Sequence, residues 1–470
     1  MPRFIFIAAV IASVAVSAQV AERGDGAPRA TEPGGVQGSP PIKEDWPQWR
    51  GPLATGVSTD ANLPLKWSAS ENIAWTARLG GEGVSTPIVI GDRVIVTSQI
   101  GSGVRRPGNH PRLTQGGDPT AAGERAIGSA ANPDGKTFFL VQAFSFADGR
   151  ELWQHRLEAT GVLTGVHDKH NLATPSPASD GSLIYAWFGT GQLVALTLDG
   201  KVAWQRHLGA EISPFDIQWG HASSPTVHGD LLFLLCDHAP ASYLLALDKR
   251  TGKERWKADR GKGLSSYSTP FVVTGPAGPA GEARAEVLVN SSERVDAYDA
   301  LSGRHLWNTG GPNRFPIPVP VVHDGIVYMS RGYRSGPYLA VKPGGKGDVT
   351  SSHVIWNVET GAPYVSSLVY ANGLLFMAND TGIVTAVDAK TGERVWQHRV
   401  PGVFSASPIA TSDRVYFVSE GGRTLVMRAS RTAEVLAEND LDARLVASPA
   451  ASKGRIFLRS DDRIFAVGAK

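Results

Sequence analysis

Two short stretches of this sequence gather side chains that could do chemistry. They are His167, His170 and Asn171 in the first stretch and Asp216, Trp219 and His221 in the second. Imidazole and carboxylate groups together suit zinc and other divalent ions. The spacing His167-x-x-His170 matches no recognised metal-ligand signature, so we expect no metal site. The competing interpretation is that these polar groups hydrogen-bond loops to one another.

Four further candidates follow toward the C-terminus. They are Arg331, Tyr364, Asp380 and Glu420. Arg331 and His170 could contact an anion in a pocket for a small ligand or peptide. Asp380 and Glu420 could act as general acid and base, but the sequence does not fix their separation. The chain contains no Gly-x-Ser-x-Gly nucleophile elbow, Walker loop or Cys-x-x-Cys pair, so no reaction class is indicated.

The elements that must position these residues belong to an internal repeat. An apolar strand enters an Asp-x-x-Thr-Gly turn, whose glycine tolerates a left-handed backbone, and the next strand carries a tryptophan. The segment from Ala386 to Trp396 is the clearest copy. The paired glycines and tryptophans are Gly149 and Trp153, Gly200 and Trp204, Gly252 and Trp256, Gly303 and Trp307, and Gly392 and Trp396. Five copies in register predict a repeat architecture, with the tryptophans packing between units.

The starts of the units predict how many there are. Each unit opens with a small polar residue followed by proline, or by leucine once. The openings are Pro87, Pro177, Pro225, Pro270, Pro320, Leu368, Pro408 and Pro449. After a longer first interval they recur at the length of propeller blades, about 40–45 residues. We therefore expect an all-β, eight-bladed β-propeller of four-stranded antiparallel blades.

Two irregular units fit this phasing. The first is long because residues 100–136 are inserted between its second and third strands. The eighth ends after three strands, and the segment from Glu71 to Leu79, with Trp75, has the character of the missing fourth. We expect this N-terminal strand to close the last blade and leave no open sheet edge.

The N-terminal region predicts export. Arg3 precedes an apolar run from Phe4 to Val16, followed by Ser17-Ala18, which is typical of a signal peptide at residues 1–18. The run is too short to span a bilayer core of about 30 Å. Residues 19–44 are rich in Gly, Pro and Ala and predict a disordered linker, so the propeller occupies 45–470. We expect a periplasmic or extracellular protein, a monomeric propeller with no transmembrane segment after cleavage.

The charge balance limits the classes of binding partner, and the cysteine content limits the possible disulfides. Lys plus Arg is 46 and Asp plus Glu is 44, for a formal charge of +2, and no basic run stands out. A nucleic-acid partner is therefore not expected. The single cysteine, Cys236, excludes an intrachain disulfide.

At this point the repeats resemble those of the PQQ-like, quinoprotein-type β-propellers, over about residues 46–470. The resemblance rests on the Asp-x-x-Thr-Gly-x-x-x-Trp signatures and the Ser/Thr-Pro openings. The Trp46-to-Pro52 segment, which we expect to plug the end of the core, and the Val341-to-Thr350 segment are similar to those of exported bacterial PQQ-binding-like repeat proteins. One branch of this superfamily uses PQQ and usually Ca²⁺ on the propeller axis. Another is a non-catalytic scaffold lipoprotein, whose lipid-anchoring cysteine is absent here.

Propeller geometry implies one shared site. Loops before the first strand and between the second and third strands lie on one face, which we call the mouth, and all ten candidates fall in such loops. We expect an exported scaffold without catalysis or cofactor, binding an envelope protein, a secreted protein or a small molecule. The alternative is a quinoprotein-like oxidoreductase that uses PQQ and a divalent cation, with Arg331, Trp219 and Tyr364 as contacts. A hydrolase or lyase acting on extracellular carbohydrate is a third hypothesis.

Overall fold

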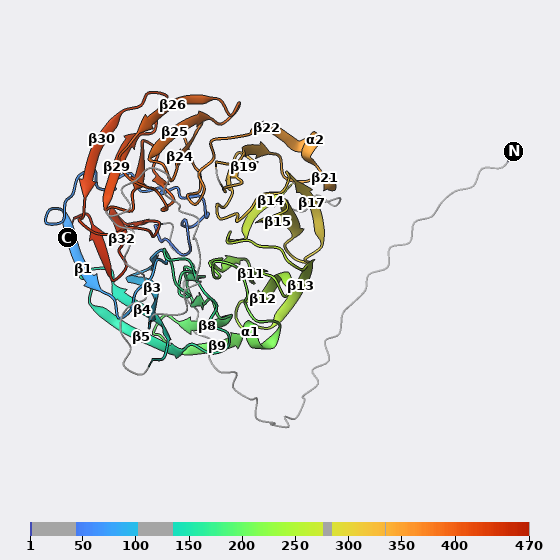
Figure 1. The fold of residues 1–470 in the computed structure, drawn as a ribbon, viewed down its shortest axis with the longest axis horizontal. Helices are drawn as coiled ribbons and strands as arrows, with labels where there is room; N and C mark the ends of the chain where they lie inside the picture. The colour runs from blue at the N-terminus through green and yellow to red at the C-terminus, as the bar shows by residue number, and fades with distance from the viewer. Residues whose placement is uncertain (2–43, 102–134, 276–283, 334, 470) are drawn as a thin grey trace, which may run out of the picture. The chain divides into compact units, whose positions relative to one another are not determined.

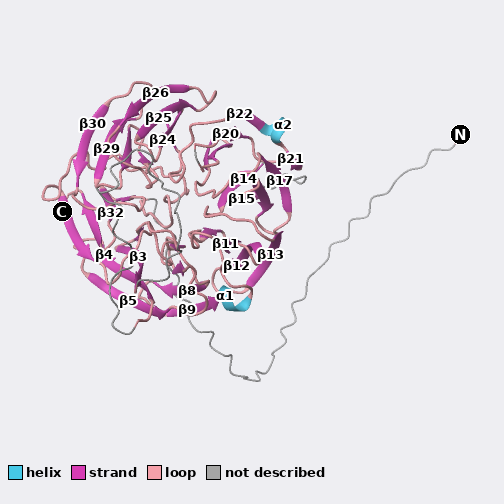
Figure 2. Cartoon of the chain, viewed as in Figure 1, coloured by secondary structure: helices cyan, strands magenta, loops and turns pink. Residues whose placement is uncertain are grey.

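The chain's apolar strands assemble into eight sheets arranged around an axis (Figure 1). The computed structural model describes Met1 and residues 44–101, 135–275, 284–333 and 335–469. The predicted signal peptide and nearly all of the predicted linker and of the insertion lie outside these residues. Strands dominate the described parts, with only two one-turn helices (Figure 2). The prediction of an eight-bladed β-propeller is confirmed.

The first four blades follow the chain in order. Blade 1 contains β2 (Ile88–Ile90), β3 (Arg93–Ile100), β4 (Phe138–Ser145) and β5 (Glu151–Glu158). Blade 2 contains β6 (Ala178–Ser179), β7 (Leu183–Trp187), β8 (Gln192–Thr197) and β9 (Val202–His207), followed by α1 (Leu208–Glu211). Blade 3 contains β10 (Thr226–His228), β11 (Leu231–Asp237), β12 (Ser242–Asp248) and β13 (Glu254–Gly261). Blade 4 contains β14 (Phe271–Gly275), β15 (Arg284–Asn290), β16 (Val295–Asp299) and β17 (His305–Thr309).

The remaining blades complete the ring. Blade 5 contains β18 (Val321–His323), β19 (Ile326–Ser330), β20 (Tyr338–Val341) and β22 (Val354–Val358). Blade 6 contains β23 (Val369–Ala371), β24 (Leu374–Ala378), β25 (Ile383–Asp388) and β26 (Arg394–Arg399). Blade 7 contains β27 (Ile409–Ala410), β28 (Arg414–Val418), β29 (Arg423–Arg428) and β30 (Val435–Asp440). Blade 8 contains β31 (Ala450–Ser452), β32 (Arg455–Arg459), β33 (Arg463–Val467) and β1 (Ile73–Arg78).

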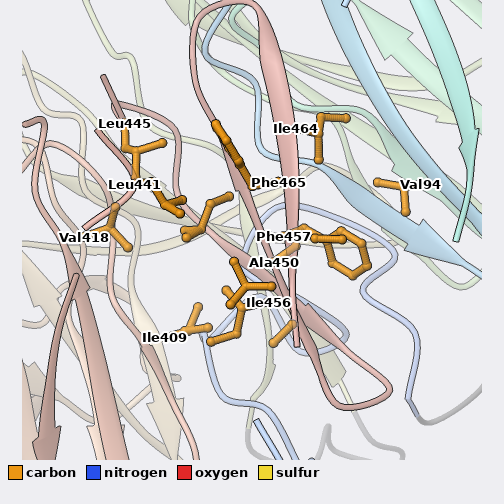
Figure 3. Close-up of a cluster of buried hydrophobic side chains, with 14 of the residues drawn as sticks. Val94, Ile409, Val418, Leu441, Leu445, Ala450, Ile456, Phe457, Ile464 and Phe465 are labelled. Atoms are coloured by element: carbon orange, nitrogen blue, oxygen red, sulfur yellow. The ribbon is translucent and has the colours of Figure 1, made fainter. Parts of the chain in front are cut away.

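The last blade closes as the sequence predicts. Strand β1 pairs antiparallel with β33, placing Trp75 opposite Ala466 and Arg78 opposite Arg463. The apolar core around this closure joins Val94 of blade 1, Ile409 of blade 7 and Phe457 of blade 8 (Figure 3). Both ends of the propeller sequence therefore share one core, and the backbone edge of β33 is paired rather than exposed.

The repeated glycine and tryptophan form an interlock between blades. Trp356 Nε1 donates to the Ala389 carbonyl of the next blade at 3.0 Å. The Trp356 ring also lies flat against Gly392, where a Cβ atom would come within 2.6 Å of it. The same hydrogen bond links Trp75 to Phe146, Trp153 to Leu198, Trp204 to Lys249, Trp256 to Ala300, and Trp396 to Ser430. Glycine is thus needed both for the left-handed turn and for contact with the preceding tryptophan.

Trp307 is the exception to this interlock. The connection in blade 5 that would receive it is replaced by a longer segment containing β21 (Gly347–Asp348) and α2 (Thr350–His353). Strand β21 adds in parallel to β17, which makes blade 4 five-stranded. Trp307 Nε1 instead donates to Glu286 Oε2 of its own blade at 2.7 Å.

Residues 44–60, here called the N-terminal plug, pair with innermost strands of the propeller. Trp46 forms a backbone bridge with Val89, and its side chain is only 1% exposed. Further along, Val57 bridges to Ala410. The plug therefore pairs with the innermost strands of blades 1 and 7. Among the described residues, no helix is long and apolar enough to cross a membrane.

Candidate functional site

The channel is lined at its narrow part by the small polar residues that open each blade. The backbone N–H of Thr86 donates to Ser176 Oγ of the next blade at 2.9 Å, and Ser176 N–H donates to Ser224 Oγ at 2.9 Å. The same bond joins Ser224 to Thr269, Val319 to Ser367, Ser367 to Ser407, and Ser407 to Ser448. We call these opening residues the hydroxyl ring. It joins neighbouring blades around the axis, and Val319 is its one apolar member.

A cavity of about 170 Å³ lies between the hydroxyl ring and the mouth. Its floor is reached by Trp49 of the N-terminal plug. Its described lining residues are Trp49, Val84, Thr86, His167, Lys169, His170, Thr174, Ser176, Trp219, Ala222, Ser224, Tyr267, Thr269, Phe315, Ile317, Tyr364, Val365, Ser405, Ser407, Val446, Ala447 and Ser448. Loops from most of the blades therefore contribute to a single cavity.

One side of this cavity is an aromatic wall made of Trp219, Tyr267, Phe315 and Tyr364. These residues come from successive loops before blades 3, 4, 5 and 6. Phe315 meets Trp219 edge-on at 6.3 Å between ring centroids and Tyr267 at 6.4 Å. Phe315 also has a φ of +54°, a left-handed backbone that is rare for a bulky residue and is commonest at functional sites.

The opposite side carries an ion pair that crosses the mouth. Lys169 Nζ, from the loop before blade 2, donates to both carboxylate oxygens of Glu420 in blade 7, at 2.8 and 2.9 Å. Ser405 Oγ also donates to Glu420. Asp380 interacts electrostatically with this pair, and burial raises its pKa above the ordinary value, with a further contribution from Glu420. The structure thus brings the two predicted carboxylates together, with Glu420 held by Lys169.

The histidines of the first stretch are fixed by one carbonyl group. The Trp219 carbonyl accepts the backbone N–H of His167 at 3.0 Å and lies 2.6 Å from His170 Nε2. His170 Nδ1 lies 3.2 Å from the Asn171 carbonyl. A neutral imidazole carries one hydrogen, and the shorter contact assigns it to Nε2. Burial lowers the pKa of His170 to about 4, with a smaller effect from His167. His170 is therefore a neutral ring that ties the loops before blades 2 and 3 together.

His221 lies behind the aromatic wall rather than in the cavity. Its ring packs against Trp187 at 4.3 Å and Phe215 at 5.0 Å between centroids, and its neighbour His238 packs on Phe215 at 4.4 Å. Burial lowers the pKa of His238 to about 4 and that of His221 well below its usual value. Both imidazoles are neutral members of an apolar cluster.

The remaining candidates stand apart from the cavity. Arg331 is 1% exposed, and its guanidinium donates to the carbonyls of Ser291 and Gly311 at 2.9 and 2.8 Å. Asn171 donates to the Glu82 carbonyl at 2.8 Å and is also buried. Asp216 is exposed. Arg331 and Asn171 thus brace loops, as the competing interpretation of the polar residues expects.

The ten predicted site residues divide into three groups. His167, His170, Trp219 and Tyr364 line the cavity, and Asp380 and Glu420 lie beside it. Asn171, Asp216, His221 and Arg331 do not line it. Sequence reasoning missed Lys169, Tyr267, Phe315 and the hydroxyl ring. The Ser/Thr-Pro openings, which the sequence shows as a repeat, are the signal from which the ring could have been found.

The lining residues can be tested against the cofactors that the fold suggests. No group of three or more His, Cys, Asp or Glu suited to a metal occurs among the described residues. PQQ carries three carboxylates, whereas the described lining contains one ammonium group, Lys169, which Glu420 already binds. Arg331, the other proposed contact, is committed to backbone carbonyls. The residues of this cavity therefore do not fit PQQ.

Comparisons with known proteins agree with the repeat. A family model described as outer membrane protein assembly factor BamB matches residues 137–398 and 380–469. Tetrathionate hydrolase of Acidithiobacillus ferrooxidans is 24% identical over 362 residues, covering 74% of this chain and 65% of that protein. BamB of Yersinia pestis is 25% identical over 270 residues, covering 55% of this chain and 61% of that protein. The chain thus spans just under two thirds of each of these relatives.

A solved structure shows the same fold at greater distance. Quinohemoprotein alcohol dehydrogenase from Comamonas testosteroni superimposes with a TM-score of 0.54 at 13% identity, covering 91% of this chain and 81% of that chain. At this identity the likeness concerns the propeller fold alone.

Proposed function

Because this chain belongs to the family of PQQ-type repeat propellers described as outer membrane protein assembly factor BamB, we propose that it is an exported binding propeller. It engages a protein partner of the cell envelope through the mouth, and a side chain of that partner enters the cavity.

The observation that carries the proposal is the aromatic wall at the mouth. Trp219 and Tyr364 are held in register by Phe315 and by Tyr333, which meets Phe315 and Tyr364 edge-on at 5.2 and 5.1 Å between centroids. Rigid aromatic side chains provide large contact area at low entropic cost and are enriched among binding hot spots. A preformed wall of this kind beside a cavity suits recognition of an apolar or aromatic group.

The polar groups of the mouth support binding more than turnover. Lys169 and Glu420 neutralise each other, and His170 is committed to the Trp219 carbonyl. Burial raises the pKa of two carboxyl groups in loops of the mouth, Asp380 and Asp461, but neither residue lines the cavity. A general acid must reach its substrate within hydrogen-bond distance, which these positions do not offer.

The proposal can be tested by photo-crosslinking in the envelope of the producing bacterium. A photoreactive phenylalanine analogue replaces Tyr333, at the outer side of the aromatic wall, and separately replaces Leu301, 83% exposed on the turn of blade 4 at the opposite face. We expect one discrete adduct from position 333, lost when Trp219→Ala is added, and none from position 301. Equal labelling at both positions would contradict the proposal.

The quinoprotein alternative is excluded or restored by a separate measurement. Purified protein is mixed with PQQ and Ca²⁺ and examined for bound-quinone absorbance and dye-linked alcohol oxidation. We expect neither bound-quinone absorbance nor alcohol oxidation, because PQQ has three carboxylates and the one ammonium group of the described lining, Lys169, is already paired with Glu420. Tight binding with turnover would replace the binding proposal by an oxidoreductase.

A further inference from the structure

In the hydroxyl ring, a set of O–H groups has no acceptor among the described residues. The oxygens of Ser176, Ser224, Thr269 and Ser448 each accept an N–H from the preceding blade. Within the described parts of the chain, none of these hydroxyls donates to another protein group. All four line the cavity, as does Thr86. Their hydrogens are therefore free to point toward whatever occupies the channel axis.

Cationic groups adjoin the ring. None of the described lining residues is a carboxylate, and the lining ammonium of Lys169 is paired with Glu420 at the rim. Two buried guanidinium groups also adjoin the ring. Arg459, 1% exposed, donates to the carbonyls of Ser85 and Thr97 at 3.2 and 2.7 Å and to Ser98 Oγ at 3.0 Å. Ser85 directly precedes Thr86 of the ring.

Arg50 of the N-terminal plug adds the second guanidinium. It is 2% exposed and donates to the carbonyls of Thr55 at 2.6 Å and of Leu368, which follows Ser367 of the ring. Among the described residues its Nε and Nη1 have no acceptor. A buried cation bound only to neutral oxygens is costly, and a nearby anion reduces that cost.

The upper part of the cavity has the opposite chemistry. Trp219, Tyr267, Phe315 and Tyr364 present ring faces and edges above the hydroxyls. The volume of about 170 Å³ is slightly larger than the roughly 150 Å³ in which an apolar cavity holds benzene. An occupant of this space is therefore about one aromatic ring with a small polar head.

We propose that the cavity binds a small aromatic or apolar monocarboxylate, with its carboxylate on the hydroxyl ring and its apolar part against the aromatic wall. This inference rests on the mouth being the binding site, and it adds the chemical class of the group that enters it. Acceptor oxygens on the ligand satisfy the free O–H groups, and Arg50 and Arg459 supply the positive field. A neutral apolar group leaves these donors unpaired, which lowers its affinity.

Thr86 is the best residue on which to test the ring. Its side chain lines the cavity and is 1% exposed, yet its hydroxyl makes no hydrogen bond to another described residue. Thr86→Val keeps the shape, and valine already occupies the equivalent place in blade 5 as Val319. Thr432→Val is a matched control, because Thr432 is exposed on the opposite face and its hydroxyl is likewise free of described partners.

The experiment is calorimetric titration of the purified chain with benzoate, with its neutral isostere benzamide and with inorganic sulfate. We expect benzoate to bind and benzamide to bind at least about tenfold more weakly. A tenfold difference in affinity corresponds to the loss of one charge-assisted hydrogen bond. Thr86→Val should weaken benzoate several-fold and leave benzamide unchanged, while Thr432→Val changes neither. Unfolding midpoints of both variants verify that they fold.

The outcomes separate this inference from the proposed function. Equal affinity for benzoate and benzamide, or an unaltered benzoate affinity in Thr86→Val, overturns the hydroxyl ring as a carboxylate site. Sulfate that binds as tightly as benzoate overturns the aromatic half. If no probe binds while the adduct at position 333 persists, the oxyanion inference fails and the binding propeller stands. Loss of that adduct removes the proposed function itself.

Discussion

Lys169 reaches across the mouth and donates to both carboxylate oxygens of Glu420, which lies 251 positions later in the chain, at 2.8 and 2.9 Å. Lys169 belongs to the loop before blade 2 and Glu420 to a loop of blade 7, so their ion pair spans blades 8 and 1 beside the cavity. The side chains are 16% and 8% exposed. This pair therefore fixes the shape of the mouth rather than serving as an isolated surface contact.

Breaking the ion pair from one side should destabilise the protein. Among the described residues, Lys169→Met leaves the buried Glu420 carboxylate with Ser405 as its one side-chain donor, and we expect a loss of about 2–4 kcal/mol in the free energy of unfolding at pH 7. Chemical denaturation measures this. The double variant Lys169→Met with Glu420→Gln should recover much of the loss, since no charge remains unpaired. A double variant as unstable as the two single losses added together would show that the residues act independently.

Two glycines of blade 6 allow a matched test of the glycine-tryptophan interlock. Gly392 has a φ of +75° and a Cβ there would lie 2.6 Å from the Trp356 ring, whereas Gly373 has a φ of +77° with open space. Gly392→Ala should cost about 3–4 kcal/mol, because both the backbone and the packing are strained. Gly373→Ala should cost about 1–2 kcal/mol, from the backbone alone. Equal unfolding free energies for the two variants would mean that contact with Trp356 contributes nothing.

The buried histidines predict how stability depends on pH. Burial lowers the pKa of His238 from 6.5 to about 4, opposed by smaller effects of Asp237 and Asp216. In the unfolded chain, His238 becomes protonated as the pH falls below 6.5. In the folded chain it becomes protonated only near pH 4. The free energy of unfolding therefore falls as the pH drops from 6.5 to 4. His238→Phe, which preserves packing on Phe215 and Tyr243, should reduce the slope by up to one proton. Denaturation midpoints from pH 7 to 4 provide the comparison, and an unchanged slope contradicts the assignment.

The architecture could be predicted from the sequence because the internal repeat determines the number and the order of the blades. The Gly-to-Trp spacing and the Ser/Thr-Pro openings predicted eight blades, and the isolated Trp75 segment predicted the closing strand. The sequence could not predict the exception at Trp307. That exception arises because β21 and α2 replace the turn of the neighbouring blade that would otherwise contact Trp307. Glu286 then receives a tryptophan that the pattern assigns to the next blade.

The site was predicted less completely because loop direction decides it. Topology placed all ten candidates on one face, but whether a side chain faces the channel depends on the path of each loop. Arg331 turns toward Ser291 and Gly311, while Trp219, three residues after exposed Asp216, enters the cavity. The hydroxyl ring was overlooked as a site because its residues repeat, and repeated residues were interpreted as structural.

Mouth tryptophans bind the partner, whereas interlock tryptophans hold the blades together. The most direct test measures the affinity of the crosslinked partner, once purified, for Trp219→Ala and Trp396→Phe. We predict that Trp219→Ala weakens binding by about 30-fold or more, as for a hot-spot residue at 2 kcal/mol, with a nearly unchanged unfolding midpoint. Trp396→Phe, which loses the 3.0 Å hydrogen bond to Ser430, should lower the midpoint and leave the affinity intact. The reverse pattern would contradict the assignment of the mouth as the binding site.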